Sequence, residues 1–172
     1  MIRSPFWQRV DKWSRGSLPV GLTLFLLLMG LLPWHLPGLG TIGISLVIIS
    51  VFYWSLKKPQ LMTPWAVLVI GLIGDLLGAT PMGVGTVSLL FLYGLVRSQA
   101  RALRNMPFLV IWGTFILMAA LAVLLSWVLT AALDVHFPDI RPALVLYLFD
   151  IVCYPPLSYV FDRLQRSLLP EK

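Results

Sequence analysis

The chain has 172 residues, of which 59% are hydrophobic and only 12% charged, and its mean hydropathy is +0.89. This composition excludes an ordinary soluble domain and indicates an integral membrane protein. A formal charge of +6 would suggest a nucleic-acid partner in a soluble protein. Here the basic residues flank apolar segments and serve membrane topology, so no nucleic-acid partner is expected.

The first apolar region is long enough for two helices. Residues 16–56 form a run of 41 residues without Lys, Arg, Asp or Glu, about twice the length that one helix needs to cross a bilayer. Two prolines and two glycines place the reversal at 33–40, which predicts helices near 18–33 and 41–56. No small-residue cleavage site follows the first segment, so it is interpreted as a membrane helix and not as a secretory signal.

Four further helices are predicted in the rest of the chain. Lys57 and Lys58 end the second helix, and Pro64 suits the first turn of the third. A turn at 79–83 separates two short helices, and two longer apolar segments follow. The sequence therefore predicts one all-α membrane domain over 1–172, with its last four helices near 61–78, 84–98, 107–133 and 142–161.

The basic residues predict how this domain is oriented. Twelve of the 13 Lys and Arg residues fall on one side of a six-helix arrangement, and Arg141 is the exception. Because Lys and Arg resist crossing the bilayer, this side is expected to be cytoplasmic and to hold both termini.

Asp75 and Asp150 are the ionisable residues inside the predicted spans. A charge within a membrane is costly, so each acid needs a partner or a proton and is a functional candidate. As a neutral acid, either could donate a hydrogen bond between helices. The simpler reading is that they hold helices together, as polar residues often do in membrane bundles.

Asp75 lies in a glycine-rich helix face. Gly71, Gly74 and Gly78 share that face and would allow close backbone approach. Pro81 and Gly83 follow, so the third and fourth helices form an interrupted hairpin of the kind that often marks a membrane binding site.

Asp150 precedes Pro155 and Pro156 in the sixth helix. The prolines leave two carbonyls without intrahelical donors and predict a kink, to which a neighbouring helix would supply donors. This kink serves either packing alone or a ligand or partner site.

Three arginines and one small-residue face complete the candidates. Arg97, Arg101 and Arg104 form one basic stripe if the fourth helix continues beyond the membrane. The stripe either retains this end in the cytoplasm or contacts anionic lipid or a partner. A face of small and polar residues on the fifth helix is expected to be a packing groove; its members are Ala119, Ala122, Ser126 and Thr130.

No catalytic, cofactor or metal site is predicted. Cys153 is the sole cysteine, His35 and His136 lie in different outer loops, and no phosphate-binding or nucleophile motif is present. An intramembrane aspartyl protease would pair two carboxyls that share a proton. Here the order of its two acidic motifs is reversed and one motif is incomplete, so this enzyme class is a remote alternative.

The stretch from Gly71 to Thr86 resembles the signature of the rod shape-determining protein MreD family, in which Gly-x-x-x-Asp-Leu leads to a small-residue turn and Pro-x-Gly. The similarity continues from Leu89 to Arg104. The sixth helix is also similar, with Asp150, the Tyr154-Pro155 step and then basic residues.

This resemblance implies a non-enzymatic, multi-pass subunit of the bacterial inner membrane. It implies action in the cell-elongation complex with MreC, the actin-like MreB filament, RodA and a class B penicillin-binding protein. It also implies a fold like that of the substrate-binding subunit of energy-coupling-factor vitamin transporters. Such an importer subunit is the alternative function, although the outer loops hold few polar groups for a vitamin.

Overall fold

The computed structural model describes residues 19–30, 42–78, 81–133 and 139–168, and all regular structure in these ranges is helical. Six helices occur there: an N-terminal helix Pro19–Gly30, α2 (Ile42–Lys57), α3 (Pro64–Leu77), α4 (Val84–Leu103), α5 (Phe108–Leu133) and α6 (Arg141–Leu168). The predicted all-α class is confirmed. The predicted reversal at 33–40, turn residues 79–80, and outer-loop Asp134 and His136 lie outside the described residues, as do the chain ends.

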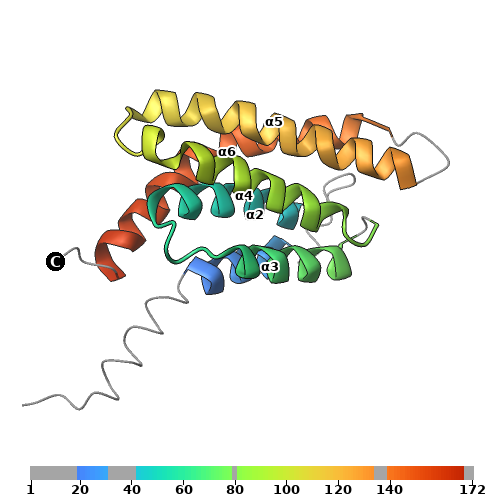
Figure 1. The fold of residues 1–172 in the computed structure, drawn as a ribbon, viewed down its shortest axis with the longest axis horizontal. Coiled ribbons are helices and arrows are strands. Elements are labelled where there is room, and N and C mark those ends of the chain that lie inside the picture. The colour runs from blue at the N-terminus through green and yellow to red at the C-terminus, as the bar shows by residue number, and fades with distance from the viewer. Residues whose placement is uncertain (1–18, 31–41, 79–80, 134–138, 169–172) are drawn as a thin grey trace, which may run out of the picture.

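The helices stack in layers, with α2 and α4 in the middle (Figure 1). Helix α4 contacts α2, α3 and α5, and α2 also contacts α6. The α2 side chains from Ile49 to Leu56 are all buried. Thr23 of the N-terminal helix lies 2.7 Å from the Ser50 hydroxyl of α2. Helices α2 and α4 therefore form the centre against which the other helices pack.

Two helices, α5 and α6, are long and apolar enough to cross a membrane. Both expose large apolar side chains: Leu109 and Leu117 of α5 are 71% and 65% exposed, and Val152 of α6 is 71% exposed. Extensive apolar exposure is unfavourable in water and favourable against lipid. These helices fit a membrane protein, while the number of crossings stays a prediction.

Two helices extend beyond their predicted ends. Helix α4 continues to Leu103, where the sequence predicted an end near 98, and α6 continues to Leu168, where it predicted an end near 161. The prediction equated helix ends with membrane boundaries, but polar residues such as Arg and Gln are good helix formers. Ala100 and Leu103 remain buried on α4, and Arg166 pairs with Asp162 at 3.1 Å on α6, so both extensions are stabilised outside the apolar segments.

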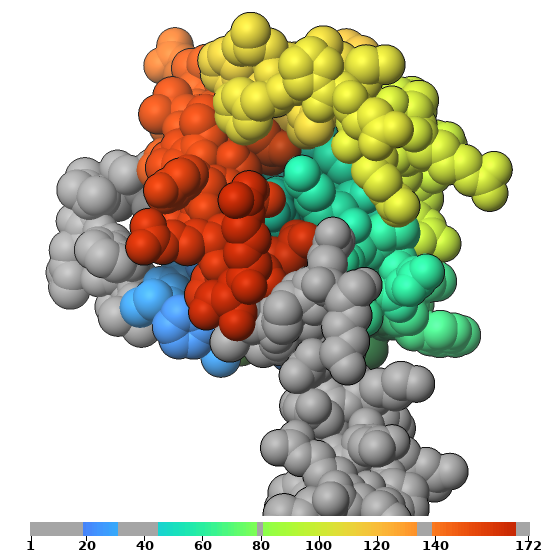
Figure 2. Space-filling view, turned by 90° about the vertical axis from the view of Figure 1, so that its left-hand side faces the viewer, coloured from blue at the N-terminus to red at the C-terminus, as the bar shows by residue number. Residues whose placement is uncertain are grey.

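Basic residues gather at one end of the helical stack. Helices α2, α4 and α6 all finish there, beside the starts of α3 and α5 (Figure 1), and Figure 2 looks onto this end. Seven of the eight Lys and Arg residues in the described ranges lie in or next to these helix ends, and Arg141 lies at the opposite end. The seven are Lys57, Lys58, Arg97, Arg101, Arg104, Arg163 and Arg166. The described part therefore has a basic end and an opposite end.

Candidate functional site

Asp75 joins α3 to the start of α4. Its Oδ2 accepts hydrogen bonds from the Gly83 N–H at 2.9 Å, the Thr86 N–H at 3.0 Å and the Thr86 hydroxyl at 2.7 Å. Its Oδ1 accepts from the Gly85 N–H at 3.0 Å. The carboxylate is 4% exposed, so one buried side chain fixes the α3–α4 hairpin.

This arrangement replaces a missing helix cap. Gly83 is the N-cap residue of α4, and it has no side chain with which to accept the free N–H groups of the first turn. Asp75 supplies that acceptor from the preceding helix, and its negative charge is favourable at a helix N-terminus. Asp75 is the acceptor in all four hydrogen bonds, and it joins two helices as the simpler reading of the sequence expected.

The glycines around Asp75 have different roles. A Cβ on Gly71 would lie 2.7 Å from the Thr86 Cα, and a Cβ on Gly85 would overlap Asp75 Oδ1. Gly83 has φ +95°, a conformation that strongly favours glycine. Gly74 instead faces the N-terminal helix, and a Cβ on it would lie 3.6 Å from the Leu27 Cδ1, an ordinary van der Waals contact. Close approach of α3 and α4 thus occurs at Gly71 and Gly85.

Gly78 and Pro81 shape the two sides of the turn. Gly78 ends α3 with an extended backbone, φ −88° and ψ 172°, and its N–H donates to the Gly74 carbonyl at 2.8 Å. The Pro81 carbonyl accepts from the Val84 N–H at 3.2 Å. The predicted single face of three glycines is therefore divided, since Gly71 meets α4, Gly74 meets the N-terminal helix and Gly78 caps α3.

Pro155 and Pro156 lie inside α6, which changes direction along its length (Figure 1). The Trp112 indole N–H of α5 donates to the Ile151 carbonyl at 3.2 Å, which is one of the carbonyls that the prolines leave without an intrahelical donor. The expected donor from a neighbouring helix is confirmed. Tyr147 of α6 also donates to the Ile116 carbonyl of α5 at 3.1 Å, so two side chains join these helices.

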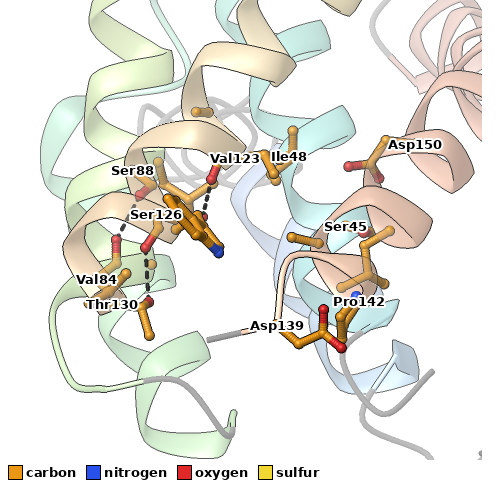
Figure 3. Close-up of a pocket in the computed structure, with 16 residues that line it drawn as sticks. Ser45, Ile48, Val84, Ser88, Val123, Ser126, Thr130, Asp139, Pro142 and Asp150 are labelled. Atoms are coloured by element: carbon orange, nitrogen blue, oxygen red, sulfur yellow. Dashed lines mark hydrogen bonds between the residues drawn. The ribbon is translucent and has the colours of Figure 1, made fainter. Parts of the chain in front are cut away.

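Asp150 borders a cavity of about 400 Å³ between α2, α4, α5 and α6. The carboxyl is 1% exposed, and within the described ranges neither oxygen has a partner in hydrogen-bond geometry. Figure 3 shows Ser88, Ser126 and Thr130 on one wall and Asp150 and Asp139 on the other. Ala122 also lines this cavity. The fifth-helix face predicted as a packing groove therefore forms much of a cavity wall.

The two acids occupy separate environments. The hydrogen bonds of Asp75 go to Gly83, Gly85 and Thr86, and Asp75 does not line the cavity that Asp150 borders. A protease dyad requires two carboxyls that share a proton. The geometry around Asp75 does not provide that arrangement.

The basic stripe on α4 contains one residue with a structural contact. Arg97 donates to the Pro59 carbonyl at 2.7 Å and lies 5.8 Å from the centre of the Tyr93 ring. It therefore holds the α2–α3 connection against α4. Arg101 and Arg104 are exposed on the last turn of α4 and at its C-cap, so they face outward at the basic end.

Several residues of this site were missed from the sequence. Thr86 and Trp112 have no motif that marks them as partners, and only the fold brings them to Asp75 and Ile151. For the contact between Asp75 and Thr86, the sequence offered one signal, which is the spacing Gly83-x-Gly85 in the turn after Asp75.

The chain matches the family model described as rod shape-determining protein MreD over residues 12–164. Searches of curated proteins and of solved structures gave no match. The matched region includes the Asp75 hairpin, the cavity and the kink in α6, and it spans most of the 172 residues. The chain therefore belongs to the MreD family of rod shape-determining proteins.

Proposed function

We propose that this protein is a multi-pass subunit of the bacterial inner membrane that crosses the bilayer six times and keeps both termini in the cytoplasm. The basic end of the described helices supports the orientation, because Lys and Arg are retained on the cytoplasmic side. The exposed apolar side chains of α5 and α6 support burial in lipid. On this topology the α3–α4 turn and the Asp150 cavity belong to the outer half of the protein.

The proposed function is that of a scaffold in the cell-elongation complex. In this role the protein docks MreC and thereby helps to link the cytoplasmic MreB filament to RodA and a class B penicillin-binding protein. The family match over residues 12–164 carries this proposal. The protein itself would catalyse no reaction.

The Asp75 hairpin gives this scaffold a defined shape. Partner helices in a membrane associate by close packing, so a docking surface needs helices at fixed separation. Four hydrogen bonds to Asp75 and the close contact at Gly71 hold α3 against α4. The outer face of α3 exposes Trp65, Leu72 and Leu76 at 74%, 45% and 62%, which leaves an apolar surface for lipid or for a partner helix.

The exposed arginines support a second contact at the cytoplasmic end. Arg101 and Arg104 are free to meet anionic lipid or an acidic protein surface. A variant with Arg101 and Arg104 both replaced by Gln keeps the Arg97 contact with the Pro59 carbonyl. Normal insertion with rounded cells would support the outward contact, and normal rods would show that these two arginines serve orientation only.

Recovery of MreC tests the scaffold proposal. Asp75→Leu should still insert into the membrane but should recover less MreC on co-purification than the wild type. Gly74→Ala is the matched control on the same helix, because a Cβ fits there, and it should recover MreC normally. Unchanged recovery with inserted Asp75→Leu would contradict a role of the hairpin in docking. The neighbouring genes distinguish this scaffold from the alternative function. A pair of transport ATPase genes beside this gene would favour an importer subunit.

A further inference from the structure

The cavity beside Asp150 contains a buried acid without a described hydrogen-bond partner. Both carboxyl oxygens are inaccessible, and within the described ranges neither has a partner in full hydrogen-bond geometry. The Ser45 hydroxyl of α2 is close enough to interact with the carboxyl, but one hydroxyl can donate to only one of its two oxygens. A buried carboxyl left unpaired is costly. A ligand that meets this group would remove that cost, so the acid is a reason for the cavity to be occupied.

Three hydroxyl groups on the wall opposite Asp150 already donate to backbone carbonyls of their own helices. The Ser88 hydroxyl donates to the Val84 carbonyl at 2.9 Å, and the Ser126 hydroxyl donates to the Val123 carbonyl at 2.8 Å. The Thr130 hydroxyl donates to the Ser126 carbonyl at 2.9 Å. Figure 3 marks these three bonds. Each hydroxyl oxygen can still accept a hydrogen bond, so the wall offers acceptors to a ligand.

The charge of the wall has one sign. Asp139 and Asp150 both line the cavity, and no Lys or Arg lies among the described lining residues. Helix N-termini at this end could in principle attract an anion instead. Those of α4 and α6 already face carboxylates, because Asp75 accepts the α4 N–H groups and Asp139 Oδ1 accepts the Arg141 N–H at 3.2 Å. With two carboxyl groups and no basic side chain among its described lining residues, the cavity favours a cation.

The size and position of the cavity define the rest of the ligand. About 400 Å³ is within the range of small-molecule sites in proteins. Asp150 lies eight residues along α6 from Pro142, or about 12 Å deep at 1.5 Å per residue. Apolar side chains such as Ile48, Leu89 and Leu146 line the space between. A ligand that fits this space has a short apolar chain and one polar head.

We propose that this cavity binds a small amphiphilic amine, with its ammonium group donating to Asp150 and its apolar chain filling the space towards the α5–α6 end. The ammonium group supplies donors to the Asp150 oxygens and a positive charge, which none of the described lining residues carries. This site is separate from the proposed docking of MreC, and binding to it can be measured on the purified chain alone.

Octylamine is the probe, with octanol and octanoate as matched compounds of the same chain length. Native mass spectrometry of the detergent-purified protein counts bound molecules, and the melting temperature reports on saturable binding. We expect one octylamine molecule to bind and to raise the melting temperature, and we expect octanol and octanoate to bind far more weakly. Equal binding of octanol and octylamine, or no saturable binding of octylamine, would overturn the proposal.

Two variants locate the binding. Asp150→Asn should weaken octylamine binding roughly 10- to 100-fold, the loss expected for a hydrogen bond to a charged group. Asp162→Asn is the control, because Asp162 accepts from Tyr53 at the basic end, and it should bind as the wild type does. Unchanged binding by Asp150→Asn would contradict the assignment. If that variant does not fold, Ala143→Phe decides, since it fills the cavity while keeping the acid and should abolish binding.

Nanodiscs distinguish two sources of the ammonium group. If a lipid headgroup fills the site, phosphatidylethanolamine should compete with octylamine, and nanodiscs of phosphatidylcholine alone should not. If the natural ligand is a free amine, both nanodiscs should give the same octylamine affinity. Either result supports ammonium binding at Asp150, provided that Asp150→Asn removes it.

Discussion

Replacing Asp75 tests whether one carboxylate holds the start of α4 against α3. Asp75→Leu removes the acceptor of three backbone N–H groups and of the Thr86 hydroxyl. Loss of a helix N-cap costs about 0.5–2 kcal/mol, and loss of a negative charge at a helix N-terminus costs a further ~0.3–1 kcal/mol. The buried hydroxyl adds about 0.6 kcal/mol, the average for interhelical hydrogen bonds in membrane bundles. We therefore expect Asp75→Leu to lower the free energy of unfolding by about 1.5–3.5 kcal/mol.

Asp75→Asn is the more discriminating variant, because the two carboxylate oxygens accept different numbers of hydrogen bonds. Three of the four hydrogen bonds go to Oδ2 and only the Gly85 N–H goes to Oδ1. An Asn whose oxygen takes the Oδ2 position keeps those three bonds but turns its amide N–H groups towards the Gly85 N–H. The expected loss is about 1 kcal/mol, clearly smaller than for Leu.

Titration with SDS in mixed micelles, followed by tryptophan fluorescence, measures these free energies of unfolding. Gly94→Ala is the control on α4, since its Cβ would lie more than 4 Å from every neighbouring helix, and it should not lose stability. Thr86→Val should lose about 0.6 kcal/mol, and its loss should shrink in an Asp75→Leu background because the shared bond is already gone. Equal losses for Asn and Leu, or a loss below about 1 kcal/mol for Leu, would refute the reasoning.

Two further predictions concern close contacts elsewhere in the bundle. Gly71→Ala should lower the free energy of unfolding by about 1–3 kcal/mol, because its Cβ would lie 2.7 Å from the Thr86 Cα. Gly74→Ala should instead be neutral or stabilising by about 0.5–1 kcal/mol. Similar values for the two variants in the same titration would contradict the assigned faces. Trp112→Phe keeps an aromatic ring but removes the donor to the Ile151 carbonyl, so it should cost about 0.6–1.7 kcal/mol, and wild-type stability would show that this carbonyl does not depend on the indole.

The helices themselves were largely predictable from the sequence, because apolar segments and breakers such as Pro64 mark them directly. Their ends were less predictable. Arg101 lies within α4 although it follows the apolar segment, since a helix can continue after it leaves the membrane. Hydropathy reports where lipid ends, and the hydrogen-bond pattern decides where the helix ends.

The candidate site was predicted in its residues but not in its contacts. Asp75 and Gly83 were identified as parts of one hairpin, yet the direction of the hydrogen bonds depends on how the turn places the free N–H groups of α4. Ser126 and Thr130 were assigned to a packing face because small residues usually pack. They line a cavity because α6 leaves space beside α5 there, which no local pattern in α5 encodes.

Single-cysteine labelling tests the proposed topology most directly. In a Cys153→Ser chain, cysteines introduced by Ser4→Cys, Ile140→Cys and Ser167→Cys are treated in spheroplasts with a membrane-impermeant maleimide. An even number of crossings with cytoplasmic termini predicts labelling of Ile140→Cys in intact spheroplasts, and of Ser4→Cys and Ser167→Cys only after lysis. Labelling of Ser4→Cys and Ser167→Cys from opposite sides of the membrane would contradict the architecture and the function proposed from it.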